Sequence, residues 1–265
     1  MKQIKIASLV LLLISVIVFG TYKIYEYKTR DNQPPVITCP TDTITASVNI
    51  TEGELLEGVV ARDETSGNVT HTLVVEKISP FTEENTRIIT YAAIDDNRNV
   101  GRVQRTLVYT DYQSPTFKLK QPLRIAMGRT ANLFNIIEAY SVLDGDLSNK
   151  VKYSVGSSID AGKTGTYEIE FRVADSAGKV EYLTTTLEVY DSTEERLKVT
   201  LTDYLIYLPV GAEFNPDDYY VPSDEEESMT SHGEVDTSTP GVYYVTYTVE
   251  NNTSKGTSKL VVIVR

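Results

Sequence analysis

The sequence predicts an all-β chain in which three tandem β-sandwich domains follow one N-terminal transmembrane helix. Three observations in the 265 residues support this prediction: one stretch occurs three times, 18 Tyr and no Trp accompany many Val and Thr, and one long apolar run lies near the N-terminus. β-Branched and aromatic side chains suit a pleated, half-buried surface, so this composition favours strands.

Residues 1–30 predict a membrane anchor. The uncharged run from residue 6 to residue 22 would form a helix roughly 25 Å long, at about 1.5 Å per residue. That length nearly spans a bilayer core, with Tyr22, Tyr25 and Tyr27 at the interface. The run exceeds the apolar region of about 7–15 residues found in signal peptides. We expect a retained anchor; a signal peptide cleaved after Gly20 and a buried core helix are the alternatives.

The charges beside this run leave its orientation open. Lys2 and Lys5 precede the run, whereas Lys23, Lys28 and Arg30 follow it. Positive charge usually marks the cytoplasmic flank, so these residues alone do not orient the segment. A basic start followed by an apolar run is typical of export signals. We expect a single-pass protein of the cell membrane whose C-terminal domains are extracellular.

The repeated stretch defines the domains. Ile89 aligns with Ile169 at an offset of 80 residues, and Ile169 aligns with Val245 at an offset of 76. The three copies occupy residues 87–111, 165–191 and 241–265. Apolar and polar residues alternate within each copy, which is the pattern of a strand with one buried face. The motif ADSAGKV interrupts the alternation, and we expect a turn there, with Asp175 accepting main-chain hydrogen bonds and Gly178 at positive φ.

Each copy therefore closes a larger unit with a β-hairpin. Upstream, PPVITCP (34–40) and SPTFKLK (114–120) each begin with proline and continue as an extended apolar stretch. We expect domains at 33–111, 112–191 and 196–265, each with about seven short strands in two packed sheets, as sandwiches have. A single sheet would leave its apolar face in water.

Two motifs resemble a known family. The second copy contains LDGDLSNKV and IDAGKTGTYEIEFRVADSAGKV, and the third contains VDTSTPGVYYVTYTV (235–249). Both resemble the bacterial Ig-like domains first noted in pesticidal crystal proteins. The first copy, with PPVITCPTDTI, resembles the related hyalin repeat. The resemblance implies three immunoglobulin-like sandwiches and no fixed activity, since such domains serve as spacers, adhesion units and accessory modules. Hyalin repeats usually carry a second cysteine; this chain has only Cys39, so we expect a free thiol.

The charge argues against nucleic acid as a partner. The chain has a formal net charge of −12, and residues 31–265 hold 20 basic and 36 acidic side chains, a net of −16. Such a body repels phosphate backbones. It suits a hydrated surface or one that collects cations.

Catalytic chemistry has little support in the sequence, and we expect no enzyme. His71, expected on a strand, and His232, expected in an acidic loop, have no partner at a recognisable spacing. The run SDEEES (223–228) is expected to be a solvated loop.

Calcium is the one cofactor that the pattern suggests. Asp144, Asp146 and Asp175 offer hard oxygen ligands on loops that could meet at one end of the second domain. Turn formation explains the same residues without a metal. The position of Asp175 becomes Asn251 in the third copy, which weakens the calcium hypothesis.

We therefore expect a non-catalytic bacterial surface protein, anchored in the membrane by its N-terminal helix. Its tandem Ig-like domains would form a stalk or adhesion module that presents a binding face to a protein or glycan ligand. The alternative is a carbohydrate- or cell-wall-binding accessory protein, for which aligned exposed aromatic side chains would be the sign.

Overall fold

The computed structural model describes residues 2–130, 132–156, 158–223 and 227–265. Residues 224–226, within the predicted solvated loop, lie outside the described residues. The chain divides into two compact units, 1–110 and 111–265, and each is described by itself.

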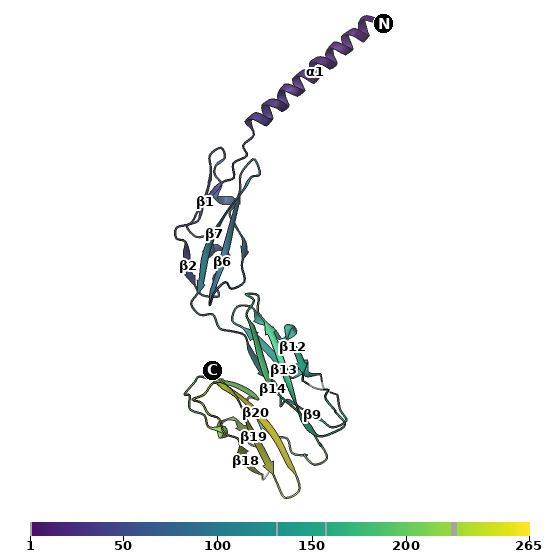
Figure 1. Ribbon diagram of the computed structural model, residues 1–265, viewed down its shortest axis with the longest axis vertical. Coiled ribbons are helices and arrows are strands. Elements are labelled where there is room, and N and C mark those ends of the chain that lie inside the picture. Colours follow the sequence, from purple (N-terminus) through teal and green to yellow (C-terminus); the bar gives the residue numbers. More distant parts are fainter. Residues whose placement is uncertain (1, 131, 157, 224–226) are drawn as a thin grey trace. The chain divides into compact units, whose positions relative to one another are not determined.

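The first unit begins with helix α1 (Lys2–Thr29). Its segment Ser8–Tyr25 is long and apolar enough to cross a membrane, and none of it is buried against the rest of the protein. Figure 1 shows α1 as one continuous helix. The hydroxyls of Ser15 and Thr21 donate to main-chain carbonyls of the preceding turn, so the helix itself satisfies these two polar groups. The helix extends past the uncharged run, through Lys23 and Lys28 to Thr29.

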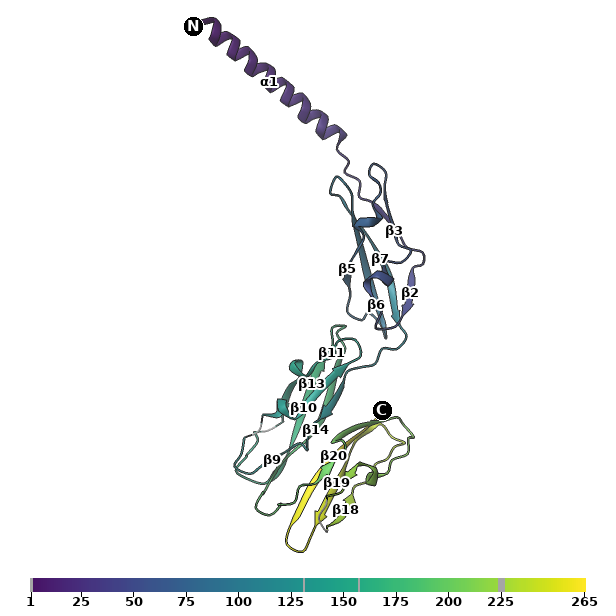
Figure 2. The ribbon, with the colours of Figure 1, turned by 180° about the vertical axis from the view of Figure 1, so that it is seen from behind.

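Residues 31–110 form domain 1, a sandwich of two sheets (Figures 1 and 2). The three-stranded sheet has the order β1-β3-β4: β1 (Val36–Thr38), β3 (Val60–Asp63) and β4 (Gly67–Asn68). The four-stranded sheet has the order β2-β7-β6-β5: β2 (Thr43–Ala46), β7 (Val100–Tyr109), β6 (Thr86–Ile94) and β5 (Val74–Ile78). Two short helical segments connect them, α2 (Glu52–Leu55) and η1 (Thr70–Thr72).

Domain 2 repeats this plan in the second unit. One sheet has the order β11-β10-β8: β11 (Gly145–Asp146), β10 (Ile137–Ser141) and β8 (Thr116–Leu119). The other has the order β12-β13-β14-β9: β12 (Lys152–Val155), β13 (Gly165–Ala174), β14 (Val180–Tyr190) and β9 (Arg124–Ala126). The connecting 3₁₀ turns are η2 (Leu133–Asn135) and η3 (Ser148–Lys150).

Domain 3 has the same four-stranded sheet and a smaller second one. The larger sheet has the order β16-β20-β19-β18: β16 (Leu205–Leu208), β20 (Lys255–Val264), β19 (Gly241–Glu250) and β18 (Ser228–His232). The smaller pairs β15 (Thr200–Leu201) with β17 (Tyr220–Val221), after η4 (Pro216–Tyr219). The chain is thus three tandem immunoglobulin-like sandwiches, and this fold prediction is confirmed.

The repeated stretches form the long hairpins β6–β7, β13–β14 and β19–β20, as predicted. Their alternate side chains fill the cores, and the aromatic residue at one repeat position is fully buried in each: Tyr91, Phe171 and Tyr247. The hydroxyl of Tyr91 donates to the Leu55 carbonyl (2.7 Å), and that of Tyr247 to the Pro216 carbonyl (2.7 Å). A buried hydroxyl needs such a partner, so these two bonds fix the connecting segments over the hairpins.

Domains 2 and 3 are joined by continuous apolar packing. One cluster of buried side chains includes Phe117 and Leu187 of domain 2 as well as Val245 and Leu260 of domain 3. The second unit is therefore a two-domain body with a shared core.

Candidate functional site

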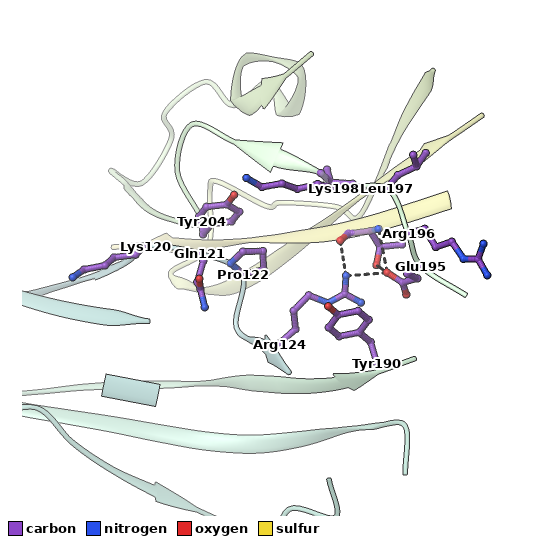
Figure 3. Close-up of a pocket in the computed structure, with 12 residues that line it drawn as sticks. Lys120, Gln121, Pro122, Arg124, Tyr190, Glu195, Arg196, Leu197, Lys198 and Tyr204 are labelled. Atoms are coloured by element: carbon purple, nitrogen blue, oxygen red, sulfur yellow. Dashed lines mark hydrogen bonds and ion pairs between the residues drawn. The ribbon is translucent and has the colours of Figure 1, made fainter. Parts of the chain in front are cut away.

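The seam between domains 2 and 3 centres on Arg124, at the start of β9 (Figure 3). Its guanidinium donates to the Thr257 carbonyl at 2.6 Å and lies 2.9 Å from the Glu195 carboxylate and 3.3 Å from that of Glu188. The same group stacks over the Tyr190 ring, 3.8 Å from its centroid. Only 11% of the Arg124 side chain is exposed. The planar, multidentate guanidinium suits such a buried junction.

Glu195 precedes domain 3 and completes the junction. Its carboxylate accepts from the Thr257 hydroxyl (2.7 Å) and N–H (3.2 Å) as well as from Arg124. Burial acts to raise the pKa of Glu195, but the hydrogen bonds from Arg124 and Thr257 and the Arg124 charge outweigh it and hold the pKa below its usual value. Glu195 is therefore an ionised partner of Arg124 at neutral pH.

A second link joins the two domains at Tyr207 in β16. Its hydroxyl accepts the Phe117 N–H of domain 2 at 2.8 Å, and burial raises its pKa. The Arg265 guanidinium lies 4.3 Å from the Tyr207 ring centroid and 3.7 Å from Glu181 of domain 2. At two separate points of the seam, a side chain of one domain is thus hydrogen-bonded to the main chain of the other: Arg124 to Thr257, and Tyr207 to Phe117.

A cavity of about 480 Å³ opens along this seam, and Figure 3 shows side chains of both domains around it. Basic residues of both domains line it, and among them the side chains of Arg196 and Lys198 are exposed. Lys120, also in the lining, pairs with Glu138 at 2.7 Å. The lining consists of Lys120, Gln121, Pro122, Arg124, Tyr190, Glu195, Arg196, Leu197, Lys198, Val199, Tyr204 and Thr257. On an acidic protein, this is a local positive surface beside tyrosine rings.

Of the predicted calcium ligands of domain 2, Asp144 lies beside the turn of Asp175, and the three together are not among the groups close enough to share an ion in the described residues. Asp144 accepts the Ser176 N–H at 2.7 Å, beside the turn that begins with Asp175. Asp146 binds the hydroxyl (2.5 Å) and N–H (2.8 Å) of Ser148 instead, and these bonds hold its pKa below the usual value.

Asp175 is buried and accepts two donors. Its Oδ1 accepts the Lys179 N–H at 2.9 Å, as the turn prediction requires, and its Oδ2 accepts the Tyr112 hydroxyl at 2.6 Å. Gly178 has φ 83°, also as predicted. Burial and the bond to Asp175 raise the pKa of Tyr112, so this hydroxyl keeps its proton. Calcium at these residues stays a prediction.

Domain 1 holds a closer carboxylate group. One oxygen each of Asp31, Asp63 and Asp95 lies within 4.8 Å of the others, the one such group of metal-ligand side chains among the described residues. Sequence reasoning missed it, because the three residues lie in separate parts of the chain that no local pattern connects. Hydrogen bonds, above all from the Ser66 N–H, hold the pKa of Asp63 below its usual value.

The histidine placements were wrong, and the cysteine prediction is confirmed. His71 lies in the 3₁₀ turn η1, because the Thr72 and Leu73 N–H groups bond back to Val69 and Thr70. His232 ends β18, paired with Thr246. Cys39 is a free thiol, and burial raises its pKa; it has little thiolate character.

Comparison with known families matches residues 201–264 to "Bacterial surface protein, Ig-like domain". An uncharacterized 81.3 kDa protein of Acholeplasma phage L2 is 26% identical over 108 residues, which are 39% of this chain and 15% of the phage protein. The chain thus spans about a seventh of that relative's length.

Two solved structures are similar at a lower level. One comprises the M60 catalytic domain with two CBM51 domains from Clostridium perfringens ZmpB, at 11% identity and a TM-score of 0.27; the match covers 87% of this chain and 43% of that one. The other is the lipoprotein BT2262 from Bacteroides thetaiotaomicron, at 15% identity and a TM-score of 0.24, covering 56% of this chain and 98% of that one. The family match thus shows that the third domain of this chain, at residues 201–264, is similar to bacterial surface Ig-like domains.

Proposed function

We propose that this chain is a non-catalytic bacterial surface protein, held in the membrane by α1, whose Ig-like domains act as a stalk and adhesion module. Helix α1 carries the proposal. The side chains of Leu11 and Phe19 are 72% and 63% exposed, and their neighbours along Ser8–Tyr25 are similarly uncovered. An apolar helix of this length is stable in a bilayer core.

The joined domains 2 and 3 support the stalk role. Two links and a common core hold them as one body, so a ligand face on either domain would be presented in a fixed relation to the other. Rigidity of this kind lowers the entropy lost on binding.

Membrane fractionation tests the anchor. We expect the full chain to resist extraction by high salt and alkaline carbonate and to be released by detergent, while a chain lacking residues 1–30 is soluble. Protease added to intact cells should digest residues 31–265. A mature N-terminus at Thr21 would mean that the segment is a cleaved signal and would overturn the anchor.

A second candidate function is binding of an acidic glycan or cell-wall polymer, and the seam cavity favours it. Arg196 and Lys198 lie exposed in its lining, on an acidic protein. Guanidinium and ammonium groups bind phosphates and carboxylates.

This candidate is tested by screening the detergent-solubilised full chain against uronate- and phosphate-containing bacterial polysaccharides. We expect Arg196→Gln with Lys198→Gln to weaken binding. Lys118→Gln is the matched control, because Lys118 is exposed in domain 2 outside the cavity lining. Equal losses in both proteins would indicate attraction by general charge rather than binding in the cavity.

A further inference from the structure

We propose that Asp31, Asp63 and Asp95 form a calcium-binding site that fastens the segment after α1 to domain 1. The three residues come from separate parts of the chain. Asp31 follows the helix by two residues, Asp63 ends β3, and Asp95 begins the turn between β6 and β7. Folding brings one carboxylate oxygen of each within 4.8 Å of the other two.

Two of these carboxylates are almost fully removed from water. Asp63 is 8% exposed and Asp95 is 5% exposed. Buried ionised carboxylates require compensation by an opposite charge or by hydrogen-bond donors. Asp63 Oδ1 accepts the N–H groups of Thr65 (3.0 Å) and Ser66 (2.6 Å). Asp95 accepts the N–H (2.7 Å) and side-chain amide (2.7 Å) of Asn99.

Asp31 supplies the independent sign that a ligand is needed. Its Oδ1 accepts the Gln33 N–H at 2.9 Å, but its Oδ2 is sealed from solvent and has no hydrogen-bond partner. Among the residues that the structure describes, none of the three carboxylates pairs with Lys or Arg. An unsatisfied buried oxygen within a group of like charges is costly, and a cation removes both costs together.

Domain 2 has a hydrogen-bond donor at the equivalent place. Asp175 is the repeat equivalent of Asp95, and its Oδ2 accepts the Tyr112 hydroxyl at 2.6 Å. Tyr112 follows Asp111, the repeat equivalent of Asp31, and Asn32 stands in its place in domain 1. In domain 1 the carboxylate of Asp31 lies beside Asp95 instead, and its Oδ2 has no donor. A cation there would supply the positive charge that these carboxylates lack.

The three oxygens lie close enough together to share one ion. Calcium tolerates irregular geometry with six to eight oxygens at about 2.3–2.6 Å, whereas magnesium demands a near-ideal octahedron at about 2.0–2.1 Å. Carboxylates from three separate parts of the chain therefore suit calcium better than magnesium. Main-chain carbonyls and water can complete the six to eight oxygens that calcium takes, about twice what these residues supply.

An ion here would hold the chain where it leaves the membrane helix. Asp31 is joined to domain 1 by one further bond, from the Asn99 side-chain amide to its carbonyl at 3.2 Å. Calcium would add direct coordination from Asp31 to Asp63 and Asp95. Trypsin cleaves after Arg30, so the Arg30–Asp31 bond reports on whether this segment is fastened.

The test uses the full chain in detergent, titrated with CaCl₂ or MgCl₂ at constant ionic strength. We expect calcium to raise the melting temperature, because an ion bound only by the folded state stabilises it, and to slow tryptic cleavage after Arg30. Asp31→Asn should weaken calcium binding at least about tenfold, the loss that even outer-shell partners of a metal cause. Without calcium, it should melt higher than the wild type, because one repelling charge is gone.

Asp96→Asn and Glu64→Gln are the matched controls. Each removes one negative charge next to a proposed ligand, and each side chain is exposed; both should keep the wild-type response. The proposal is overturned by any of three results: equal effects of both ions, a calcium response that persists in Asp31→Asn, or a response lost only in Asp144→Asn. A trio that shares a proton instead would ignore calcium and lose stability as pH rises, which would also overturn it.

Discussion

The guanidinium of Arg124 and the carboxylate of Glu195 lie 2.9 Å apart across the seam of domains 2 and 3. With 11% and 16% of their side chains exposed, they form a buried pair. Each also bonds to Thr257 of β20, Arg124 to the carbonyl and Glu195 to the hydroxyl and N–H. One residue of domain 3 is therefore held from both sides, which couples the folding of the two domains.

Replacing Arg124 with Met should uncouple domains 2 and 3. The variant leaves Glu195 as a buried charge without its partner, which costs about 3–5 kcal/mol. We expect the urea unfolding of the second unit to separate into two transitions. Tyrosine fluorescence and circular dichroism would monitor this unfolding. Arg102→Met is the control, because Arg102 pairs with Glu76 at 2.7 Å on the exposed surface of domain 1. An equal loss in both variants would refute the coupling role of Arg124.

The stability of the second unit should depend on pH through Glu195. Its pKa is lowered in the folded protein, so its contribution is present above the unfolded value, about 4.3. This contribution is lost as pH falls through the lower, folded value. Glu195→Gln should reduce stability at pH 7 and flatten the fall in stability below about pH 5. A profile with the wild-type slope would mean that other carboxylates determine the acid sensitivity.

Gly256→Ala should disrupt the start of domain 3. A Cβ at residue 256 would lie 2.0 Å from the Leu197 carbonyl oxygen, so the main chain must move. We expect a lower melting temperature for the second unit in calorimetry. Gly53→Ala in α2 is the control, since its Cβ would meet nothing closer than 4.0 Å and Ala favours a helix by up to about 1 kcal/mol. Similar behaviour of the two variants would show that the seam tolerates the shift.

Calcium binding at Asp144, Asp146 and Asp175 is tested separately, in the full chain. The melting of the second unit as a whole is measured, because domains 2 and 3 share a core. If these residues bind calcium, Asp144→Asn in the full chain should remove a calcium-specific rise in the melting of this unit, with affinity of roughly 10⁻⁴–10⁻³ M. An unchanged rise would leave the three residues as turn formers.

Local patterns in the sequence predicted the fold well, because each hairpin carries its own period-two signal. Tyr167 to Val173 alternate as expected, and the burial of Ile169, Phe171 and Val173 follows from that alternation. The turn at Asp175 and Gly178 was also predictable, because the hydrogen bond that closes it joins Asp175 to Lys179, only four residues later.

The seam and the carboxylate group of domain 1 were not predictable in the same way. Arg124 and Thr257 are 133 residues apart. Strands β1 to β6 lie between Asp31 and Asp95 in the sequence. No local period connects such residues, so only the folded chain brings them together. His71 was misplaced because Thr70 and Thr72 suit a strand by propensity, whereas main-chain bonds close a 3₁₀ turn there.

The parallel strand pairs have a mechanical consequence. In every domain a short early strand runs parallel to the last one: β2 with β7, β9 with β14 and β16 with β20. Tension applied to the two ends of a domain would pull the early strand backward and the last strand forward along the same axis. The hydrogen bonds between them are then loaded in shear and share the force, instead of opening one after another. Domain 2 has three paired positions here and domains 1 and 3 have four each, so domain 2 is the expected place of first rupture.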